Sequence, residues 1–225
     1  MGIWNPWNPV EEKSETFRRV QHSSRTTPTY LVQTYHPLIE YADPSIMMPL
    51  DDSFVDGGIR REPSLEHEMP GITSICRGST FAPSLIPGDH IIYFTTKQSH
   101  SGSPSTVNYL VAALRIEKTF RNHQDAAAYY RKLGKVLPVN CMVKGTSYRI
   151  LGNVSMGNHK AQDNFYAARV KANPIFHVCK KMKANLHNPK GISEQQLIKL
   201  IGRNKMARNC MTITKSQFTK LLTMI

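Results

Sequence analysis

The chain has 225 residues, of which 40% are hydrophobic, and its 29 Lys and Arg against 16 Asp and Glu give a formal net charge of +13. This length allows one large domain with appendages, and the apolar content is sufficient for a core. No window holds about 18 uninterrupted apolar residues, and the N-terminus lacks the basic and apolar regions of a signal peptide, so we expect a cytoplasmic protein without membrane contact.

Residues 1–28 are expected to form an N-terminal arm. They contain the tandem repeat WNPWNP, and Asn-Pro pairs favour turns over helix. Trp4 and Trp7 either stack on a nucleobase or, as we favour, hold the arm against the body of the protein. The β-branched and aromatic run at 29–35 then predicts a strand, and residues 37–70, rich in Pro, Asp and Gly, predict a long ordered loop.

Strands dominate the next part of the chain. We expect them at 71–78, 90–95 and 108–117, with the turn at 87–89 leading into the second and a polar, mobile loop at 97–106 preceding the third. A helix is expected at 123–133, because Asn122 can cap it, Asp125 falls at its third position and Gly134 can end it. Two further strands are predicted at 148–151 and 165–170.

The C-terminal tail is predicted to be helical. Ser193 with Gln196, and Thr214 with Gln217, have the spacing of capping boxes, and each pair precedes an apolar run. The basic connector between the two helices leaves open a helix-turn-helix that enters a DNA groove. We favour a hairpin of packed helices instead, because the second helix is short and carries only two lysines.

Neither a metal site nor a cofactor site is expected. Cys76, Cys141, Cys179 and Cys210 form no C-x-x-C pair, and their wide spacing does not resemble a zinc module. His177 and Cys179 would share a face of a strand, but buried, reduced thiols are the better interpretation. The chain also lacks a nucleophile elbow, a phosphate-binding loop, a G-x-G-x-x-G motif and an H-E-x-x-H motif.

The basic residues are concentrated in the second half of the chain. Residues 113–225 hold 21 Lys and Arg against 4 Asp and Glu, whereas residues 1–112 hold 8 against 12. Clustered cations release counterions from phosphates, so this asymmetry predicts a nucleic-acid partner. The alternative is a solvated basic surface without a specific partner. The oligomeric state stays open.

The order of short motifs resembles the PUA-like superfamily, which includes the ASCH, EVE and YTH modules. These motifs are Cys76-Arg77 at a strand end, Gly88-Asp89 before an aromatic strand, the run from Tyr109 to Glu117, and the sequence DNFY at 163–166. The nearest type is the nucleotide-modification-associated domain of bacteria and phages. The resemblance implies an α+β fold, in which a mixed PUA-like β-barrel has flanking helices and a C-terminal basic helical hairpin. The expected divisions are an arm at 1–28, the barrel at 29–176 and a basic helical extension at 177–225.

The resemblance further implies a cleft that accepts a base lifted out of its strand, in a reader of modified DNA linked to DNA modification or phage defence. A flipped base is held by stacking and by hydrogen bonds to its edge, while cations grip the flanking phosphates. The base-contacting candidates are Tyr30, Tyr35, Arg77, Ser79, Phe81, Tyr93 and Tyr166, with Asp163 and Asn164 also able to read a base edge. The phosphate-contacting candidates are Lys180, Lys181, Lys183, Arg203, Lys205 and Arg208.

An enzyme that acts on modified bases is the alternative to a reader. A glycosylase-like hydrolase needs a group that places a water molecule, and Asp163, Asn164 and His159 are the candidates. Asp163 is one of only four acids in the basic half of the chain. A single acid is weak support for catalysis, so a binding protein is the favoured interpretation, and non-specific binding of RNA or DNA is a further alternative.

Overall fold

A computed structural model describes residues 24–38, 54–75, 78–96, 98–99, 106–149, 156–203 and 210–225. Within these ranges lies one eight-stranded sheet with the strand order β2-β6-β5-β3-β1-β8, in which β4 and β7 also pair with β5. The strands are β1 (Tyr30–Tyr35), β2 (Gly71–Thr73), β3 (His90–Thr95), β4 (Gln98–Ser99), β5 (Thr106–Phe120), β6 (Phe176–Ala184), β7 (Lys190–Ile192) and β8 (Met211–Ile213).

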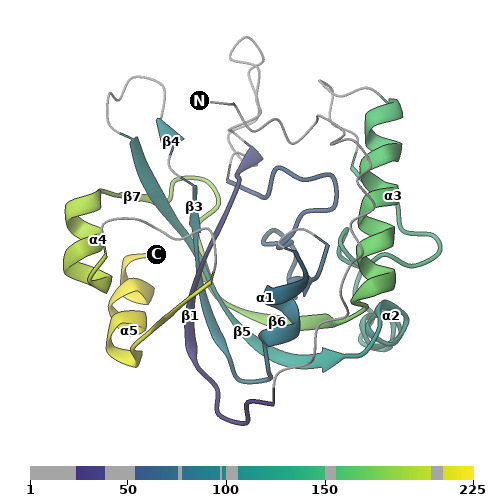
Figure 1. Ribbon diagram of the computed structural model, residues 1–225, viewed down its shortest axis with the longest axis horizontal. Helices are drawn as coiled ribbons and strands as arrows, with labels where there is room; N and C mark the ends of the chain where they lie inside the picture. Colours follow the sequence, from purple (N-terminus) through teal and green to yellow (C-terminus); the bar gives the residue numbers. More distant parts are fainter. Residues whose placement is uncertain are drawn as a thin grey trace.

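The sheet is mixed and strongly curved (Figure 1). Strands β1 and β3 run parallel, and the other pairs are antiparallel. Register shifts interrupt the pairing of β5 with β3 and with β6. Such bulges bend a strand and increase its twist, which accounts for the curvature of the 15-residue strand β5.

Apolar side chains cover both faces of the sheet. On the face that we call the inner face, Leu31, Tyr93 and Leu114 pack with Phe54 and with Phe81 of α1 (Gly78–Ser84). On the opposite, outer face, the alternate residues of the same strands pack against α4 (Glu194–Ile201) and α5 (Lys215–Met224). Helices α2 (His123–Lys132) and α3 (Met156–Ala172) lie at the other side of the molecule from α4 and α5 (Figure 1). The result is an α+β fold with a curved mixed sheet and flanking helices, as expected.

Local capping signals gave the most accurate predictions. The side chain of Asn122 accepts a hydrogen bond from the Asp125 backbone N–H at the start of α2. Both capping boxes form, one at Ser193 before α4 and one at Thr214 before α5. The strand predicted at 90–95 is β3, and the one predicted at 29–35 is β1 with a one-residue difference.

Several predicted elements are wrong. The strand expected at 71–78 ends at Thr73, and α1 begins at Gly78. Residues 165–170 belong to helix α3, and Tyr148 and Arg149 are not in a strand. Gln98–Ser99 pairs with β5 inside the segment expected to be a mobile loop.

The segment 177–225 is not a purely helical extension. Nearly all of β6 lies in it, as do β7 and β8, and all three strands belong to the sheet. The lysines of β6 obscured this strand in the sequence. Its first residues, Phe176–Cys179, are buried, whereas most of the lysine-rich second half is exposed. Long lysine side chains can extend to solvent from a strand end, so they are compatible with pairing there.

Candidate nucleic-acid interface

The aromatic residues predicted to contact a base do not converge. Tyr35, Phe81 and Tyr93 are buried in the core of the inner face, and the Tyr35 hydroxyl donates to the Phe54 carbonyl. Tyr30 lies on the outer face, where its ring stacks on His90 with 5.0 Å between centroids. Arg77 and the side chain of Ser79 lie outside the described residues. Among the described aromatic residues predicted to contact a base, Tyr166 is the one that lies beside predicted polar residues, namely His159 and Asp163.

Helix α3 brings three predicted residues together on one side. His159, Asp163 and Tyr166 follow each other at helical spacings of four and three, and His159 and Tyr166 are the buried residues of this helix. Asn164 is exposed and points in another direction. The rings of Tyr148 and His159 stack at 5.9 Å with an interplanar angle of 9°. Asp163 and His159 are therefore placed in one cluster, from which Asn164 is separated.

Asp163 is held by an arginine that the sequence interpretation did not include. Arg60 Nε donates to Asp163 Oδ1 at 2.6 Å and Arg60 Nη2 donates to Oδ2 at 3.0 Å, while Nη1 donates to the Val139 carbonyl. The guanidinium also lies 5.8 Å from the ring centroid of Tyr148. A carboxylate in such a two-bond pair has both oxygens engaged, so this geometry fits a positioning role better than proton transfer by Asp163.

Two buried polar atoms next to this group have no hydrogen-bond partner among the described residues, namely His123 Nε2 and Gln162 Oε1. Burial, with a smaller contribution from Arg60, lowers the pKa of His123 to about 4, so its ring is neutral. Its Nδ1 accepts from the Met142 backbone N–H, which leaves the proton on Nε2. The two atoms are therefore a donor and an acceptor. We name the residues around them the α3 cluster, which comprises Arg60, His123, Tyr148, His159, Gln162, Asp163 and Tyr166.

The loop at 54–65 carries buried charge that sequence reasoning missed. Asp56, Arg60, Arg61 and Glu62 are each less than 7% exposed. Arg61 has a φ of 48°, which is uncommon for a residue other than glycine. Its guanidinium donates to the Asp56 carbonyl, and Asp56 Oδ1 accepts from the Gly58 and Glu62 backbone N–H groups. The one available signal was the charged triplet at 60–62 within a Gly- and Pro-rich loop.

Glu62 joins three segments of the chain. Its carboxyl accepts hydrogen bonds from the Thr73 backbone N–H at 2.6 Å, the Thr73 hydroxyl at 2.9 Å and Asn140 Nδ2 at 2.8 Å. Burial raises the pKa of Glu62 to about 8, even though these hydrogen bonds act in the opposite direction. The group therefore titrates near neutral pH rather than in the ordinary range of a carboxylic acid.

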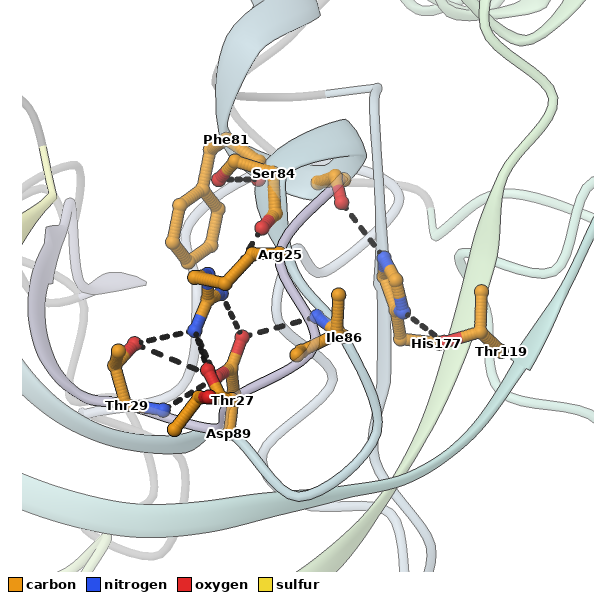
Figure 2. Close-up of polar contacts among 10 residues, drawn as sticks. Arg25, Thr27, Thr29, Phe81, Ser84, Ile86, Asp89, Thr119 and His177 are labelled. Carbon is orange, nitrogen blue, oxygen red and sulfur yellow. Dashed lines mark hydrogen bonds and ion pairs between the residues drawn. The ribbon is translucent and has the colours of Figure 1, made fainter. Parts of the chain in front are cut away.

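Asp89 is a structural residue in the turn directly before β3. It is fully buried and accepts from Arg25 Nη1 at 2.7 Å, from Arg25 Nη2 at 2.5 Å and from the Thr29 and Ile86 backbone N–H groups. Figure 2 shows Arg25 between Asp89 and Ser84, where it fixes the end of the predicted arm to the turn before β3. Burial opposes ionisation of Asp89, but the bonds from Arg25, Ile86 and Thr29 hold its pKa below the usual value. Trp4 and Trp7 lie outside the described residues.

The interpretation of His177 and Cys179 as core residues is supported by their contacts. Both are completely buried, and the two ring nitrogens of His177 lie 2.8 Å from the Thr119 hydroxyl and the Ala82 carbonyl (Figure 2). Burial raises the pKa of the Cys179 thiol well above its ordinary value. Within the described ranges, no group of three or more His, Cys, Asp and Glu side chains could hold a metal ion. In the same ranges, no helix has both the length and the apolar character needed to cross a bilayer.

A row of two aromatic rings followed by two cations crosses the outer face of the sheet. Tyr30 pairs with His90, His90 with Arg115 and Arg115 with Lys180, so these four residues lie side by side on β1, β3, β5 and β6. Phe218 of α5 contacts the rings of Tyr30 and His90, whereas Arg115 and Lys180 are exposed. Burial and then the charge of Arg115 lower the pKa of His90, which is consistent with a positive environment.

The three predicted lysines of β6 divide between the two faces. Lys183 pairs with Ala113, whose side chain lies in the outer-face core, so Lys183 shares that face with Arg115 and Lys180. Lys181 pairs with Leu114 on the inner face, where its Nζ lies 3.5 Å from the Glu66 carbonyl and burial lowers its pKa. We name Arg115, Lys180 and Lys183 the cationic strip.

The remaining predicted cations contribute less to this surface. Arg203 is exposed just after α4, and Lys205 and Arg208 lie outside the described residues. Arg115 was not predicted, although its pairing with Lys180 makes it central to the strip. Its guanidinium also contacts Glu117 at 2.9 Å on the surface. Such an exposed pair contributes little stability, so Arg115 stays available to a phosphate.

The sequence matches no family model and no curated protein. Among solved structures, the chain is similar to ASCH from Zymomonas mobilis with 10% identity and a TM-score of 0.41, over 87% of this chain and 94% of that one. A mutant of the same protein aligns with 10% identity and a TM-score of 0.36, over 87% of this chain and 95% of that one. ASCH is one of the modules named in the resemblance above.

Proposed function

We propose that this is a nucleic-acid-binding protein and that the cationic strip contacts the phosphate backbone. The observation that supports this most is the pairing of Arg115 with Lys180 on the outer face, with Lys183 on the same face beside α5, where its exposed Nζ lies 3.4 Å from the Leu222 carbonyl. Helix α5 adds the exposed residues Lys215 and Lys220. Closely spaced cations on a rigid sheet release counterions when phosphates bind, and this supplies sequence-independent affinity.

The finer form of the proposal is that DNA is the preferred partner and that an unpaired or modified base is read at the α3 cluster. Tyr148 supplies a ring, Arg60 a cation, and His123 and Gln162 an unpaired donor and acceptor. These are the groups that recognise the edge and face of a base. The pairing of Asp163 with Arg60 favours recognition over hydrolysis, and a role in phage defence rests on the resemblance alone.

The experiment measures binding of labelled duplexes and single strands, with normal or modified cytosines, by fluorescence anisotropy. The test variant replaces Arg115, Lys180 and Lys183 with Gln. The matched control replaces Lys132, Lys144 and Lys199, three exposed lysines outside the strip, and has the same net charge. We expect the test variant to lose affinity for every oligonucleotide and the control to retain most of it. Equal losses in both would refute the strip as the binding surface.

The same samples distinguish the finer alternatives. Preferential binding of one modified base without a product supports a reader, and loss of that preference in Gln162→Ala would assign it to the α3 cluster. Formation of abasic sites would establish the enzyme alternative. Equal affinity for all duplexes, with a steep salt dependence, would leave non-specific binding.

A further inference from the structure

A β-bulge beside the cationic strip determines the face on which Lys183 lies. In the pairing of β5 with β6, Leu114 is opposite Lys181 and Ala113 is opposite Lys183, so Met182 is an extra residue on β6. Successive side chains of a regular strand alternate between the two faces, and position 183 would then share the inner face with Lys181. With the bulge, Lys183 lies on the outer face opposite Ala113, which belongs to the outer-face core.

A second bulge, on β5, has the same effect on Lys118. Ile116 pairs with Cys179 on the inner face, whereas Lys118 pairs with Val178, so Glu117 is the extra residue. Val178 alternates with Cys179 and lies on the outer face, where it packs with residues of α2. Lys118 is therefore also on the outer face, although a regular strand would place it on the inner face with Ile116.

The two bulges place cations on three consecutive pairs of the outer face. A bulge next to a functional site commonly re-aims a side chain in this way. Each pair is two ladder steps from the next, which is about 6.8 Å along an antiparallel strand, so the pairs extend over roughly 14 Å. The pairs are Ala113 with Lys183, Arg115 with Lys180, and Lys118 with Val178, and their basic side chains are exposed. We name Lys118 together with the cationic strip the extended strip.

The extended strip lies on the part of the outer face between two groups of helices. At one end, Ala113 packs in the cluster that α4 and α5 complete, and at the other end Val178 packs with Ala126 and Tyr130 of α2. Figure 1 shows β5 and β6 running from the side of α4 and α5 to the side of α2. The exposed cations between these helices therefore follow the direction of the two strands.

Aromatic rings hold Lys118 at the α2 end of this surface. Its Nζ lies 4.6 Å from the ring centroid of Tyr129, on α2, and 5.4 Å from that of Phe120. The face of an aromatic ring attracts an ammonium group and limits its motion. It does not occupy the N–H donors as a carboxylate would, so a phosphate can still accept hydrogen bonds from Lys118. The cation is thus positioned before an anion binds.

We propose that Lys118 is a further phosphate-binding residue, and that the backbone of one nucleic-acid strand follows the extended strip from Lys183 to Lys118. Successive phosphorus atoms of a nucleic-acid strand are separated by as many backbone bonds as every second Cα atom of a polypeptide, so the two repeats have similar lengths. The proposal rests on the proposed function and gives its phosphate contacts a direction along β5 and β6. The strand is either a single strand or one strand of a duplex, since both present the same phosphodiester backbone.

The test measures the salt dependence of binding to an oligonucleotide single strand and to a duplex of the same length. Lys118→Gln should flatten the slope by about 0.7 for the single strand or about 0.9 for the duplex, the values for one phosphate contact. Lys118→Arg should retain the wild-type slope, because arginine keeps the charge and also stacks on aromatic rings. If Lys118 had only a structural role, Lys118→Gln would change the stability and leave the slope unchanged.

Lys132→Gln is the matched control for charge. Lys132 is exposed on α2, two positions after the buried Tyr130 and therefore on the opposite side of the helix from the sheet. This variant has the same net charge as Lys118→Gln, and it should retain the wild-type slope. Circular dichroism verifies that each variant is folded.

Glu117→Gln tests whether the strand passes over the β5 bulge. Glu117 contacts Arg115 at 2.9 Å, so its carboxylate competes with a phosphate for that guanidinium. Removing the charge should strengthen binding by about 1.4- to 5-fold, the range for one exposed ion pair. Glu68→Gln changes the net charge equally, at an exposed acid bonded to Lys135, and should leave the affinity unchanged. Unchanged or weaker binding by Glu117→Gln would show that the strand does not cross the bulge.

The outcomes separate this proposal from the proposed function. A flattened slope in Lys118→Gln with only one of the two forms would identify that form as the one bound along the extended strip. An unchanged slope in Lys118→Gln with both forms, together with a flattened slope when Arg115, Lys180 and Lys183 are replaced, would overturn the role of Lys118 and leave the proposed function intact. If the wild-type protein binds no nucleic acid, both proposals fail.

Discussion

The stability of this protein should decrease as the pH rises from about 5 to 8, because folded Glu62 holds its proton more tightly than unfolded Glu62 does. The carboxyl is 6% exposed and bonded to Thr73 and Asn140. Its pKa is about 8 in the folded protein, against 4.5 for an unperturbed group. Between these values the native state holds a proton that the unfolded state has released, so the free energy of unfolding falls with increasing pH.

The magnitude follows from the size of the pKa shift. Each pH unit within the window changes the free energy of unfolding by about 1.4 kcal/mol, so the full shift corresponds to roughly 5 kcal/mol. The fall in the free energy of unfolding is complete above about pH 8, where Glu62 is ionised in both the folded and the unfolded state. Below pH 4.5 it is absent, because the group is protonated in both.

Urea unfolding of the wild type and of Glu62→Gln at several pH values between 5 and 8 measures this effect. Glutamine cannot ionise, so the variant should lose the Glu62 part of the slope, whatever its stability at any one pH. Glu68→Gln is the control, because Glu68 is on the surface and bonded to Lys135, and it should retain the wild-type slope. Identical slopes in the wild type and Glu62→Gln would show that Glu62 is not the source of the pH dependence.

Three further substitutions test the fold. Asp89→Asn should destabilise the protein by about 1.5–3 kcal/mol, because a neutral amide replaces the carboxylate that accepts from both Arg25 Nη atoms; a melting temperature within 2 °C of the wild type, by calorimetry, would contradict this. Thr214→Ala should cost about 1 kcal/mol in urea unfolding through loss of the α5 cap, whereas Thr223→Ala, near the end of that helix, should cost less. Gly71→Ala should destabilise by about 1–3 kcal/mol, since a Cβ there would lie 2.6 Å from Phe176 Cζ and 2.7 Å from Asn140 Oδ1; unchanged thermal unfolding would show that both neighbours can move.

The elements that could be predicted are those set by local interactions. The caps at Asn122, Ser193 and Thr214 depend on residues three positions apart, and each of them forms. Helix α3 was missed because its pattern is not amphipathic, with two buried residues in 17, and because Phe165-Tyr166 suggested a strand. Strand β8 was missed because three residues, Met211–Ile213, are too short a signal within a basic connector.

The candidate site depends on contacts that no local pattern reveals. Arg60 meets Asp163 across 103 positions, and Glu62 meets Asn140 across 78. Predicted residues such as Tyr35 and Tyr93 instead fill the core, because aromatic residues in apolar strands are buried more often than exposed. The strip was found in part, since the lysines of β6 were visible in the sequence. The face of the sheet on which each of these lysines lies is set by the register shift between Ala113 and Leu114 in the pairing of β5 with β6.

Phosphate binding by the cationic strip can be measured through the salt dependence of duplex binding. The logarithm of the association constant falls linearly with the logarithm of salt concentration, by about 0.9 for each phosphate contact. Replacing Arg115, Lys180 and Lys183 with Gln should therefore flatten the slope by about 2.7, three times the value for one contact. The control with Lys132, Lys144 and Lys199 replaced should keep the wild-type slope. An unchanged slope in the strip variant would show that Arg115, Lys180 and Lys183 do not contact phosphates.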